Sequence, residues 1–178
     1  NLIDEIATLG GVEIIDLKGR YEGTIVDQAP DPDLYRRVAD AFPGTLIEDP
    51  ALTPETESAL GPSGLARVSW DAPIHSLADV AAQPAPAAAV NVKPSRIGSV
   101  AELLRIYESL AQARIPMYGG GQMELGPGRG HIQLLASLFH PHGPNDVAPT
   151  PYNLPSLPET LPPSPIPVSA GGGFSWEM

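Results

Sequence analysis

The chain has 178 residues, 42% of them hydrophobic, and a formal net charge of -11, so it is long enough to bury one sizeable core. The acidic balance argues against nucleic acid or an anionic membrane surface as a partner, and no apolar run approaches the roughly 20 residues of a membrane-spanning helix. The sequence contains no cysteine, which excludes disulfides and thiolate metal sites and suits a reducing, cytoplasmic environment.

Apolar runs typical of strands alternate with helix-like patterns along most of the chain. The clearest helix is expected over 99–114, where apolar residues recur at helical spacing and Ser99 forms a capping-box pattern with Glu102. The expected elements, in chain order, are a helix end at 1–11, a strand at 12–19, a helix at 32–42, strands at 45–50 and 66–72, a helix at 75–82, a strand at 88–94, the helix at 99–114, a strand at 115–121, a helix at 128–139 and a weaker strand at 145–150.

This alternation predicts an α/β fold on a parallel sheet, either doubly wound or a barrel. No helix opens with a glycine-rich phosphate loop of the dinucleotide or Walker type, which disfavours the nucleotide-binding doubly wound alternative. After residue 148 the composition shifts sharply to proline. We therefore expect a barrel segment over 1–153 and a proline-rich extended tail over 154–178.

Charged residues close four successive predicted strands. They lie at or next to the last apolar position of each strand, about 20 to 30 residues apart, which is roughly the length of one strand–helix unit in a barrel. The four residues are Asp16, Glu48, Asp71 and Lys93. All strands of a parallel barrel point the same way, so these groups are expected on the face that carries the chemistry of barrel enzymes.

Three carboxylates on one face repel one another and lose hydration when they are buried. A divalent cation would relieve both costs, and oxygen-only ligands indicate Mg2+ or Mn2+ and not zinc. Such a cation would disfavour the charged form of Lys93 and so favour its use as a general base. The alternative is that these groups are ordinary strand-end charges in salt bridges.

The sequence resembles the enolase superfamily, in particular its muconate lactonizing enzyme and o-succinylbenzoate synthase branch, over about residues 10 to 153. Four segments carry the resemblance in the family's order and spacing: LIEDP around Glu48, SWDAPIHS around Asp71, VNVKPSRIGS around Lys93 and GGGQMELGPG around Glu124. The resemblance implies a partial (β/α)8 TIM-like barrel, about strands three to eight. It also implies chemistry in which a lysine removes the proton alpha to a metal-bound carboxylate.

Residue by residue, the resemblance implies a role for each matching position. Asp16, Glu48 and Asp71 correspond to the Mg2+ ligands. Lys93 corresponds to the base on the sixth strand, and Glu124 to a glutamate near the substrate.

Lys18 departs from the family pattern. The family has Asp-x-Asn on the third strand, whereas the segment DLKG puts Lys18 in the Asn position. With a strand period of two, Lys18 faces the same side as Asp16. It either enters the site, where it competes with the metal or acts as an acid–base group, or pairs with a carboxylate and serves structure only.

The resemblance also implies strands one and two, with a lysine pair on strand two, and an N-terminal capping domain. A complete barrel takes about 250 residues, so we expect either a fragment or one half of a split barrel that needs a partner chain. The expected activity is Mg2+-dependent removal of a proton alpha to the carboxylate of a small substrate, as in racemases, cycloisomerases and dehydratases, which are isomerases or lyases. The alternative is a non-catalytic metal-binding or scaffold homologue.

Other polar and aromatic residues are expected to serve structure. We expect His75 to begin a helix, Ser95 and Arg96 to cap and pack at a turn, and Trp70 and Tyr118 to pack in the barrel or against helices. His140 and His142 are expected in a surface loop.

Overall fold

The chain folds around one curled parallel sheet. The computed structural model describes residues 2–122, 124 and 127–147. Within them the strands follow one another in the order β1-β2-β3-β4-β5, every neighbouring pair being parallel. The strands are β1 (Ile14–Asp16), β2 (Leu46–Glu48), β3 (Val68–Trp70), β4 (Ala89–Val92) and β5 (Met117–Gly119).

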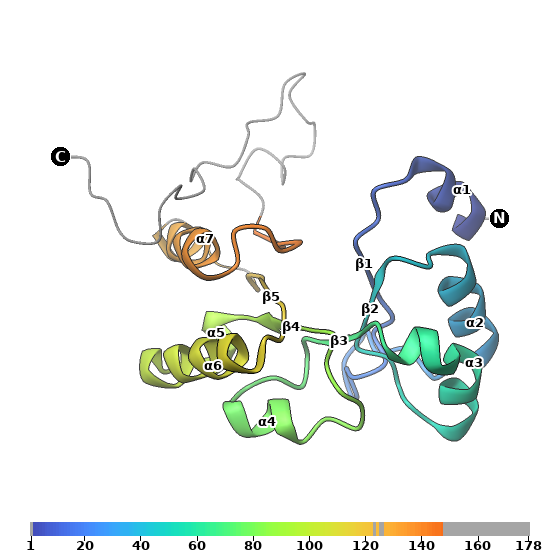
Figure 1. The fold of residues 1–178 in the computed structure, drawn as a ribbon, viewed down its shortest axis with the longest axis horizontal. Coiled ribbons are helices and arrows are strands. Elements are labelled where there is room, and N and C mark those ends of the chain that lie inside the picture. Colours follow the sequence, from blue (N-terminus) through green and yellow to red (C-terminus); the bar gives the residue numbers. More distant parts are fainter. Residues whose placement is uncertain (1, 123, 125–126, 148–178) are drawn as a thin grey trace.

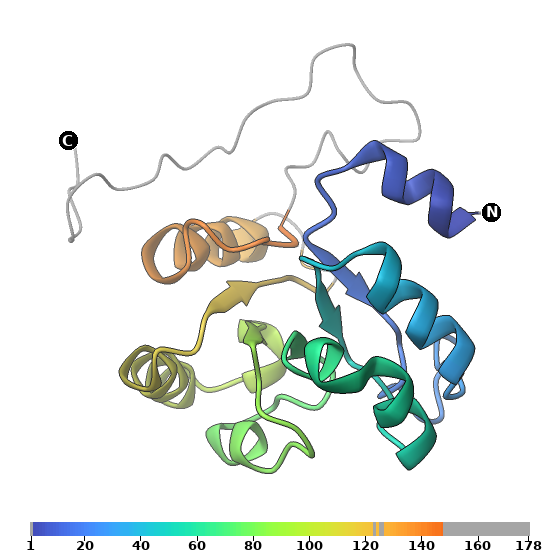
Figure 2. The ribbon, with the colours of Figure 1, turned by 45° about the vertical axis from the view of Figure 1, so that its right-hand side comes forward.

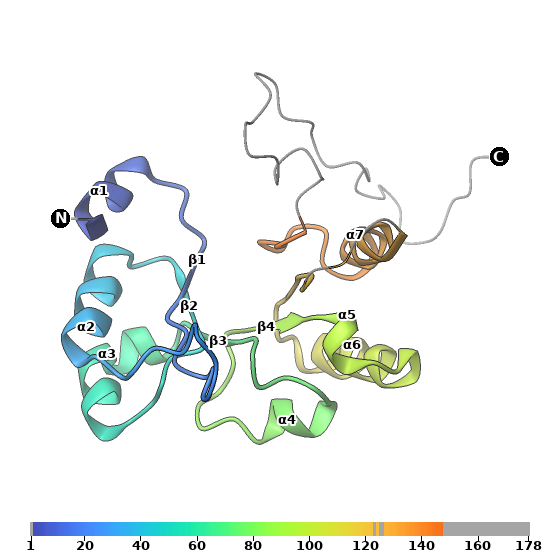
Figure 3. The same cartoon turned by 180° about the vertical axis from the view of Figure 1, so that it is seen from behind.

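Helices connect the strands and cover the outside of the sheet (Figure 1). They are α1 (Leu2–Leu9), α2 (Pro32–Ala41), α3 (Pro54–Leu65), α4 (Leu77–Ala81), α5 (Pro94–Ile97), α6 (Val100–Ala113) and α7 (Pro127–Phe139). Figure 2 shows the strands along an arc with α2 to α6 outside it, and the reverse view in Figure 3 shows α1 to α3 and α5 to α7 on opposite sides of the strands. This is part of a TIM-like barrel, as the sequence predicts.

Two apolar clusters hold the helices to the sheet. One joins β3 and β4 to α6 and is centred on Trp70, Val90 and Ile106. The other joins β1 and β2 to α2 and α3 and includes Tyr35 and Ile47. The residues of β3 and β4 are buried, because a parallel sheet in an α/β fold is covered on its faces, whereas those of β1 are only partly buried.

The helix starts follow capping chemistry that is visible in the sequence. The Asp31 carboxylate accepts the N–H groups of Asp33 and Leu34, each at 3.0 Å, and so caps α2. Ser99 caps α6 by accepting the N–H of Glu102 at 3.4 Å. The reciprocal half of that predicted capping box is absent from the described hydrogen bonds, because the Glu102 carboxylate accepts the N–H of Leu77 at 2.8 Å and thereby ties α6 to α4.

Helix α3 is missing from the expected elements. Its interior contains Gly61, with a positive φ of 61°, followed by Pro62, so that two short helical pieces meet at a kink. Both residues disfavour helix interiors, and they mask the pattern that would have indicated a helix. The start of this helix is well formed, because Thr53 and Thr56 exchange capping-box hydrogen bonds.

The weak strand expected at 145–150 is reduced, within the described residues, to one parallel bridge between Gly120 and Asp146. The Asp146 N–H donates to the Gly119 carbonyl at 2.8 Å. Residues 148–178 lie outside the described part, and with them the predicted tail. None of the described helices has both the length and the hydrophobicity needed to cross a bilayer.

Candidate functional site

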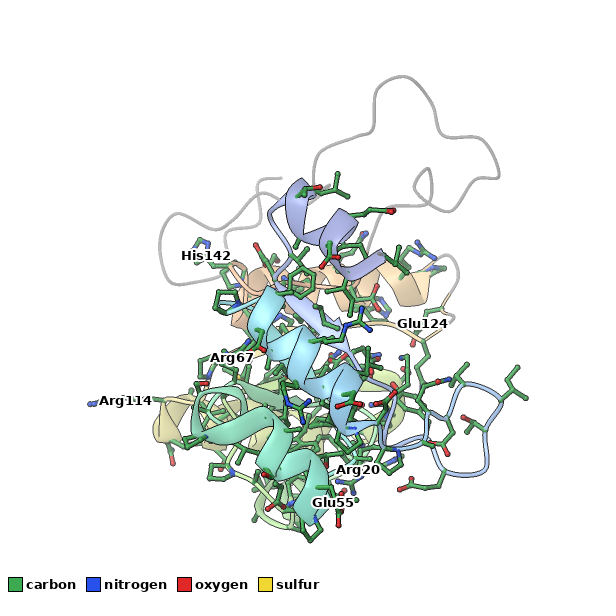
Figure 4. All side chains as sticks on the ribbon, turned by 90° about the vertical axis from the view of Figure 1, so that its right-hand side faces the viewer. Arg20, Glu55, Arg67, Arg114, Glu124 and His142 are labelled. Atoms are coloured by element: carbon green, nitrogen blue, oxygen red, sulfur yellow. The ribbon has the colours of Figure 1, made fainter. Side chains whose placement is uncertain are left out.

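Strand register brings the predicted site residues to one end of the sheet. In the strand register Asp16 pairs with Glu48, and Glu48 pairs with Ser69. Asp71 lies two residues after Ser69, just past the carboxyl end of the same strand. Lys93 directly follows β4. Seen from the side in Figure 4, Arg20 and Glu124 mark the carboxyl ends of the strands, whereas Arg114 and His142 lie toward the opposite end.

Asp71 is the most heavily bonded carboxylate of the site. Its side chain is 1% exposed, and it accepts Lys93 Nζ on Oδ2 at 2.9 Å and Arg96 Nη1 on Oδ1 at 2.7 Å. The Tyr21 hydroxyl also donates to Oδ2 at 3.1 Å. Burial by itself would raise the pKa of Asp71, but the Lys93 and Arg96 cations outweigh it and hold that pKa below its usual range. Asp71 is therefore a buried carboxylate that stays charged.

Arg96 has a different role from the one predicted. The sequence suggested capping and packing at the turn after Lys93. Instead its guanidinium also donates to the backbone carbonyl of Asp71, so it holds both the side chain and the main chain of that residue. A side chain with a rigid fork of donors is suited to such a double contact.

The surroundings of Glu48 shift its pKa in the opposite direction from that of Asp71. It is buried and accepts hydrogen bonds from the Tyr118 hydroxyl and, at 3.3 Å, from Asn91 Nδ2. Burial, followed by repulsion from the Asp71 carboxylate, raises the pKa of Glu48 to about 8. Asn91 Oδ1 is buried beside this group with no hydrogen-bond partner in the described part of the chain.

Tyr118 was predicted as a packing residue, and that prediction is incomplete. The ring is buried, but its hydroxyl reaches Glu48 and, at 3.1 Å, Ser69 Oγ. Trp70, by contrast, is a core residue as predicted, with its indole N–H bonded to the Ala85 carbonyl at 3.1 Å. A buried phenol needs a partner, which is the signal that could have placed Tyr118 at a polar site.

Lys18 reaches the site by a turn and not by strand periodicity. The strand ends at Asp16, and Lys18 has a positive φ of 54°. Its Nζ forms an ion pair with Asp16 Oδ2 and its backbone N–H donates to Asp16 Oδ1 at 2.8 Å. Nζ also lies 3.2 Å from the Tyr21 hydroxyl. Both Lys18 and Asp16 thus lie at the carboxyl end of β1.

Asp49 belongs to the site framework and was not singled out from the sequence. It is fully buried and accepts the backbone N–H groups of Asp71 and Ala72 at 2.9 and 2.7 Å. Burial raises the pKa of Asp49 to about 6, although these two hydrogen bonds act in the opposite direction. Its position between Glu48 and a proline gave no indication of this role.

Glu124 follows β5, the strand beside β4, and lies close enough to Lys93 to be influenced by its charge. Glu124 Oε2 accepts the Gln122 N–H at 2.6 Å, and its carboxylate borders a cavity of about 150 Å3 that Arg129 and Asp146 also line. Burial opposes the charged form, but hydrogen bonds, first that of Ser95, and the Lys93 charge lower the pKa of Glu124.

The three histidines weighed in the sequence, His75, His140 and His142, differ in their burial. His142 and His75 are exposed, as expected of loop and helix-start residues. His140 is buried, which contradicts the surface-loop prediction; its Nδ1 lies 2.7 Å from Asn145 Oδ1 and its Nε2 3.4 Å from the Tyr107 hydroxyl. It packs where a side chain on Gly119 would overlap its ring.

The donor chemistry fits a hard divalent cation, because Asp16, Glu48 and Asp71 offer buried or half-buried oxygens that repel one another. Their arrangement does not yet gather around one point: across the described residues, no group of three His, Asp or Glu side chains is placed to hold a metal ion. Two of these carboxylates are instead in ion pairs, Asp16 with Lys18 and Asp71 with both Lys93 and Arg96.

The fold is that of a partial barrel, and the sequence comparisons support a relationship to the enolase superfamily over part of the chain. A crystal structure of an enolase-superfamily member from Listeria innocua Clip11262 has the same fold, with a TM-score of 0.54 and 21% sequence identity, over 83% of this chain and 47% of that one. Over residues 1–154 the sequence matches the C-terminal domain of a domain of unknown function, DUF8230, and the chain belongs to this family.

Two curated relatives are similar to parts of this chain. An N-succinylamino acid racemase of Thermus thermophilus is 43% identical over 58 residues, 33% of this chain and 16% of the relative. An N-succinylamino acid racemase of an Amycolatopsis species is 37% identical over 125 residues, 66% of this chain and 32% of the relative. The chain thus spans about a third or less of the curated relatives that it matches.

Proposed function

We propose that this chain forms part of a Mg2+-dependent enzyme that removes the proton alpha to the carboxylate of a small substrate. The observation that carries the proposal is the position of Lys93, whose Nζ lies 2.9 Å from the buried carboxylate of Asp71 at the carboxyl ends of the strands. The names of the two curated relatives point to N-acylated amino acids as the substrate class. Racemisation is then the leading reaction, and cycloisomerisation or elimination of water are the others.

Lys93 is the proposed base because it lies at the carboxyl ends of the strands, beside a proposed metal ligand. In its neutral form, Nζ takes the alpha proton, and the electron pair of the broken C–H bond passes into the enolate of the substrate carboxylate. Asp71 retains Arg96 as a partner at 2.7 Å when Lys93 loses its charge or turns toward substrate. This second cation avoids leaving a buried carboxylate unpaired, which is costly.

Asp16, Glu48 and Asp71 are the proposed metal ligands. A divalent cation held there would supply positive charge to the substrate carboxylate and to the enolate. Glu124, beside the cavity, is proposed to contact the substrate, and Lys18 pairs with Asp16. The strands that complete the barrel, and a capping segment, are proposed to come from further polypeptide, either in the same protein or in a partner chain.

Hydrogen exchange tests the base assignment directly. The native protein, this chain together with the polypeptide that completes its barrel, is incubated with Mg2+ and an N-succinylated amino acid in deuterated water, and the alpha-proton signal is followed by NMR. Lys93→Ala should abolish exchange and leave metal affinity largely intact, whereas the control Arg37→Ala, an exposed cation on α2, should exchange as the wild type does. Unchanged exchange in K93A would exclude Lys93 as the base.

A non-catalytic homologue is the second candidate. The ion pair of Lys18 with Asp16 favours it, because it neutralises one of the proposed ligands. Calorimetric titration with Mg2+ or Mn2+ separates the two: absence of binding favours the scaffold function, and binding accompanied by proton exchange favours the enzyme.

A further inference from the structure

The distribution of lysine in this chain is unusual. The sequence contains two lysines, Lys18 and Lys93, and both ammonium groups lie on carboxylates at the strand ends. Lys93 shares its carboxylate with Arg96, but the ion pair on Asp16 is made by Lys18 alone among the ion pairs of the described residues. Lys18 therefore supplies the positive charge that Asp16 would otherwise take from a bound cation.

The local backbone holds Lys18 on Asp16. The two residues are joined by a turn in which the Lys18 N–H donates to Asp16 Oδ1 at 2.8 Å, with Lys18 at a φ of 54°. Tyr21, three residues further along the chain, also contacts the Lys18 ammonium. Lys18 Nζ lies 3.2 Å from the Tyr21 hydroxyl and 4.3 Å from the centroid of its ring. A cation tethered two residues from its carboxylate competes at a high effective concentration.

The ammonium of Lys18 is only part-buried, with a side chain 38% exposed. It therefore has room to leave Asp16 without passing through the core.

We propose that Lys18 is a built-in competitor for the metal, so that a divalent cation binds Asp16 only by displacing its ammonium. The inference rests on the proposed metal role of Asp16, Glu48 and Asp71 and adds a residue that sets the affinity. When the metal binds, the ion pair between Lys18 and Asp16 is replaced by a contact between Asp16 and the metal. The metal affinity of the protein is reduced by the free energy of that ion pair, and its metal-free state is stabilised by the same interaction.

Mn2+ titration of three matched variants tests this, with binding followed by calorimetry and by the EPR signal of free Mn2+. Lys18→Asn removes the charge and tolerates the left-handed backbone, which Asn adopts more readily than most residues. Lys18→Arg keeps the charge, and Asp16→Asn removes the contested ligand. We expect K18N to bind Mn2+ about tenfold or more tightly than the wild type, K18R to bind like the wild type, and D16N to lose the gain when combined with K18N.

Thermal unfolding supplies a readout that does not depend on activity. Without metal, K18N should melt at a lower temperature than the wild type, because Asp16 loses its counter-charge; with Mn2+, its melting temperature should rise by more than that of the wild type. Far-UV circular dichroism of K18N verifies the fold. Equal Mn2+ affinity of K18N and wild type would overturn the inference alone. A failure of every variant to bind Mn2+ would overturn both the inference and the proposed metal site.

Discussion

Asp49 Oδ1 accepts the backbone N–H of Asp71 at 2.9 Å, so one buried carboxylate fixes the backbone that presents another. The second oxygen accepts the N–H of Ala72 at 2.7 Å. Asp49 itself has a positive φ of 47°, a conformation that Asp tolerates better than most residues. These bonds join the end of β2 to the end of β3, beyond the last paired residues of the two strands.

Asp49→Asn should destabilise the fold. An asparagine offers one acceptor oxygen and turns an NH2 group toward the second N–H donor, so a buried hydrogen bond is lost, at a cost of about 1–3 kcal/mol. Urea denaturation measures the change in the free energy of unfolding. Asp40→Asn, on the exposed side of α2, is the matched control and should stay within about 0.5 kcal/mol of the wild type. Equal stabilities of D49N and D40N would contradict the positioning role.

Tyr118→Phe should lower the free energy of unfolding. It removes the donor to the buried Glu48 and to Ser69, which costs about 1–3 kcal/mol because a buried acceptor loses its partner. Above about pH 8 Glu48 is ionised, because its pKa is raised to about 8. At such a pH the same substitution in a Glu48→Gln background should cost less, since the hydrogen bond lost there is not charge-assisted. Denaturation of the four proteins gives the coupling free energy, and a coupling near zero would show that Tyr118 acts by packing alone.

Gly120→Ala should displace the proposed base. A Cβ at Gly120 would lie 2.6 Å from Lys93 Cε and 3.4 Å from its Nζ, so the lysine must move, and a displacement of about 1 Å can cost about 100-fold in rate. The measurement is alpha-proton exchange in deuterated water. Gly130→Ala is the control, because a Cβ there meets nothing within 4 Å and alanine favours the interior of α7. Exchange in G120A at the wild-type rate would contradict the placement of Lys93.

His140 should make stability depend on pH. Burial, only partly offset by the hydrogen bond to Asn145, lowers the pKa of His140 below its ordinary value of 6.5. The folded state therefore favours the neutral ring, and this contribution is fully present above the unfolded pKa and is lost as the pH falls through the folded pKa. The groups that face the ring are Asn145 and the Tyr107 hydroxyl.

Unfolding free energies at pH 7.5 and pH 5 test this contribution. The wild type should lose more stability over this interval than His140→Asn, whose side-chain amide can still donate to Asn145 but does not titrate. An exposed histidine provides the control, so His142→Asn should follow the wild type. An identical loss in wild type and H140N would show that His140 does not contribute.

Much of the fold could be predicted because its signals are local. Apolar runs, helical spacing over 99–114 and cap residues such as Asp31 and Ser99 each act within a few positions of the chain, and the strands and most helices appear where they were expected. Helix α3 was missed because Gly61 and Pro62 interrupt its pattern, and its two halves are held by packing on α2. Tertiary packing here overrides propensity.

Of the candidate site, the sequence by itself determined which charged residues close the strands, since parallel strands place their carboxyl ends on one face. Only the tertiary structure decided their partners. The pairing of Arg96 with Asp71, of Tyr118 with Glu48 and of Asp49 with the Asp71 backbone joins residues 22 to 70 positions apart. Hydrogen bonds over such separations depend on strand register and helix packing, and no local pattern in a single sequence encodes them.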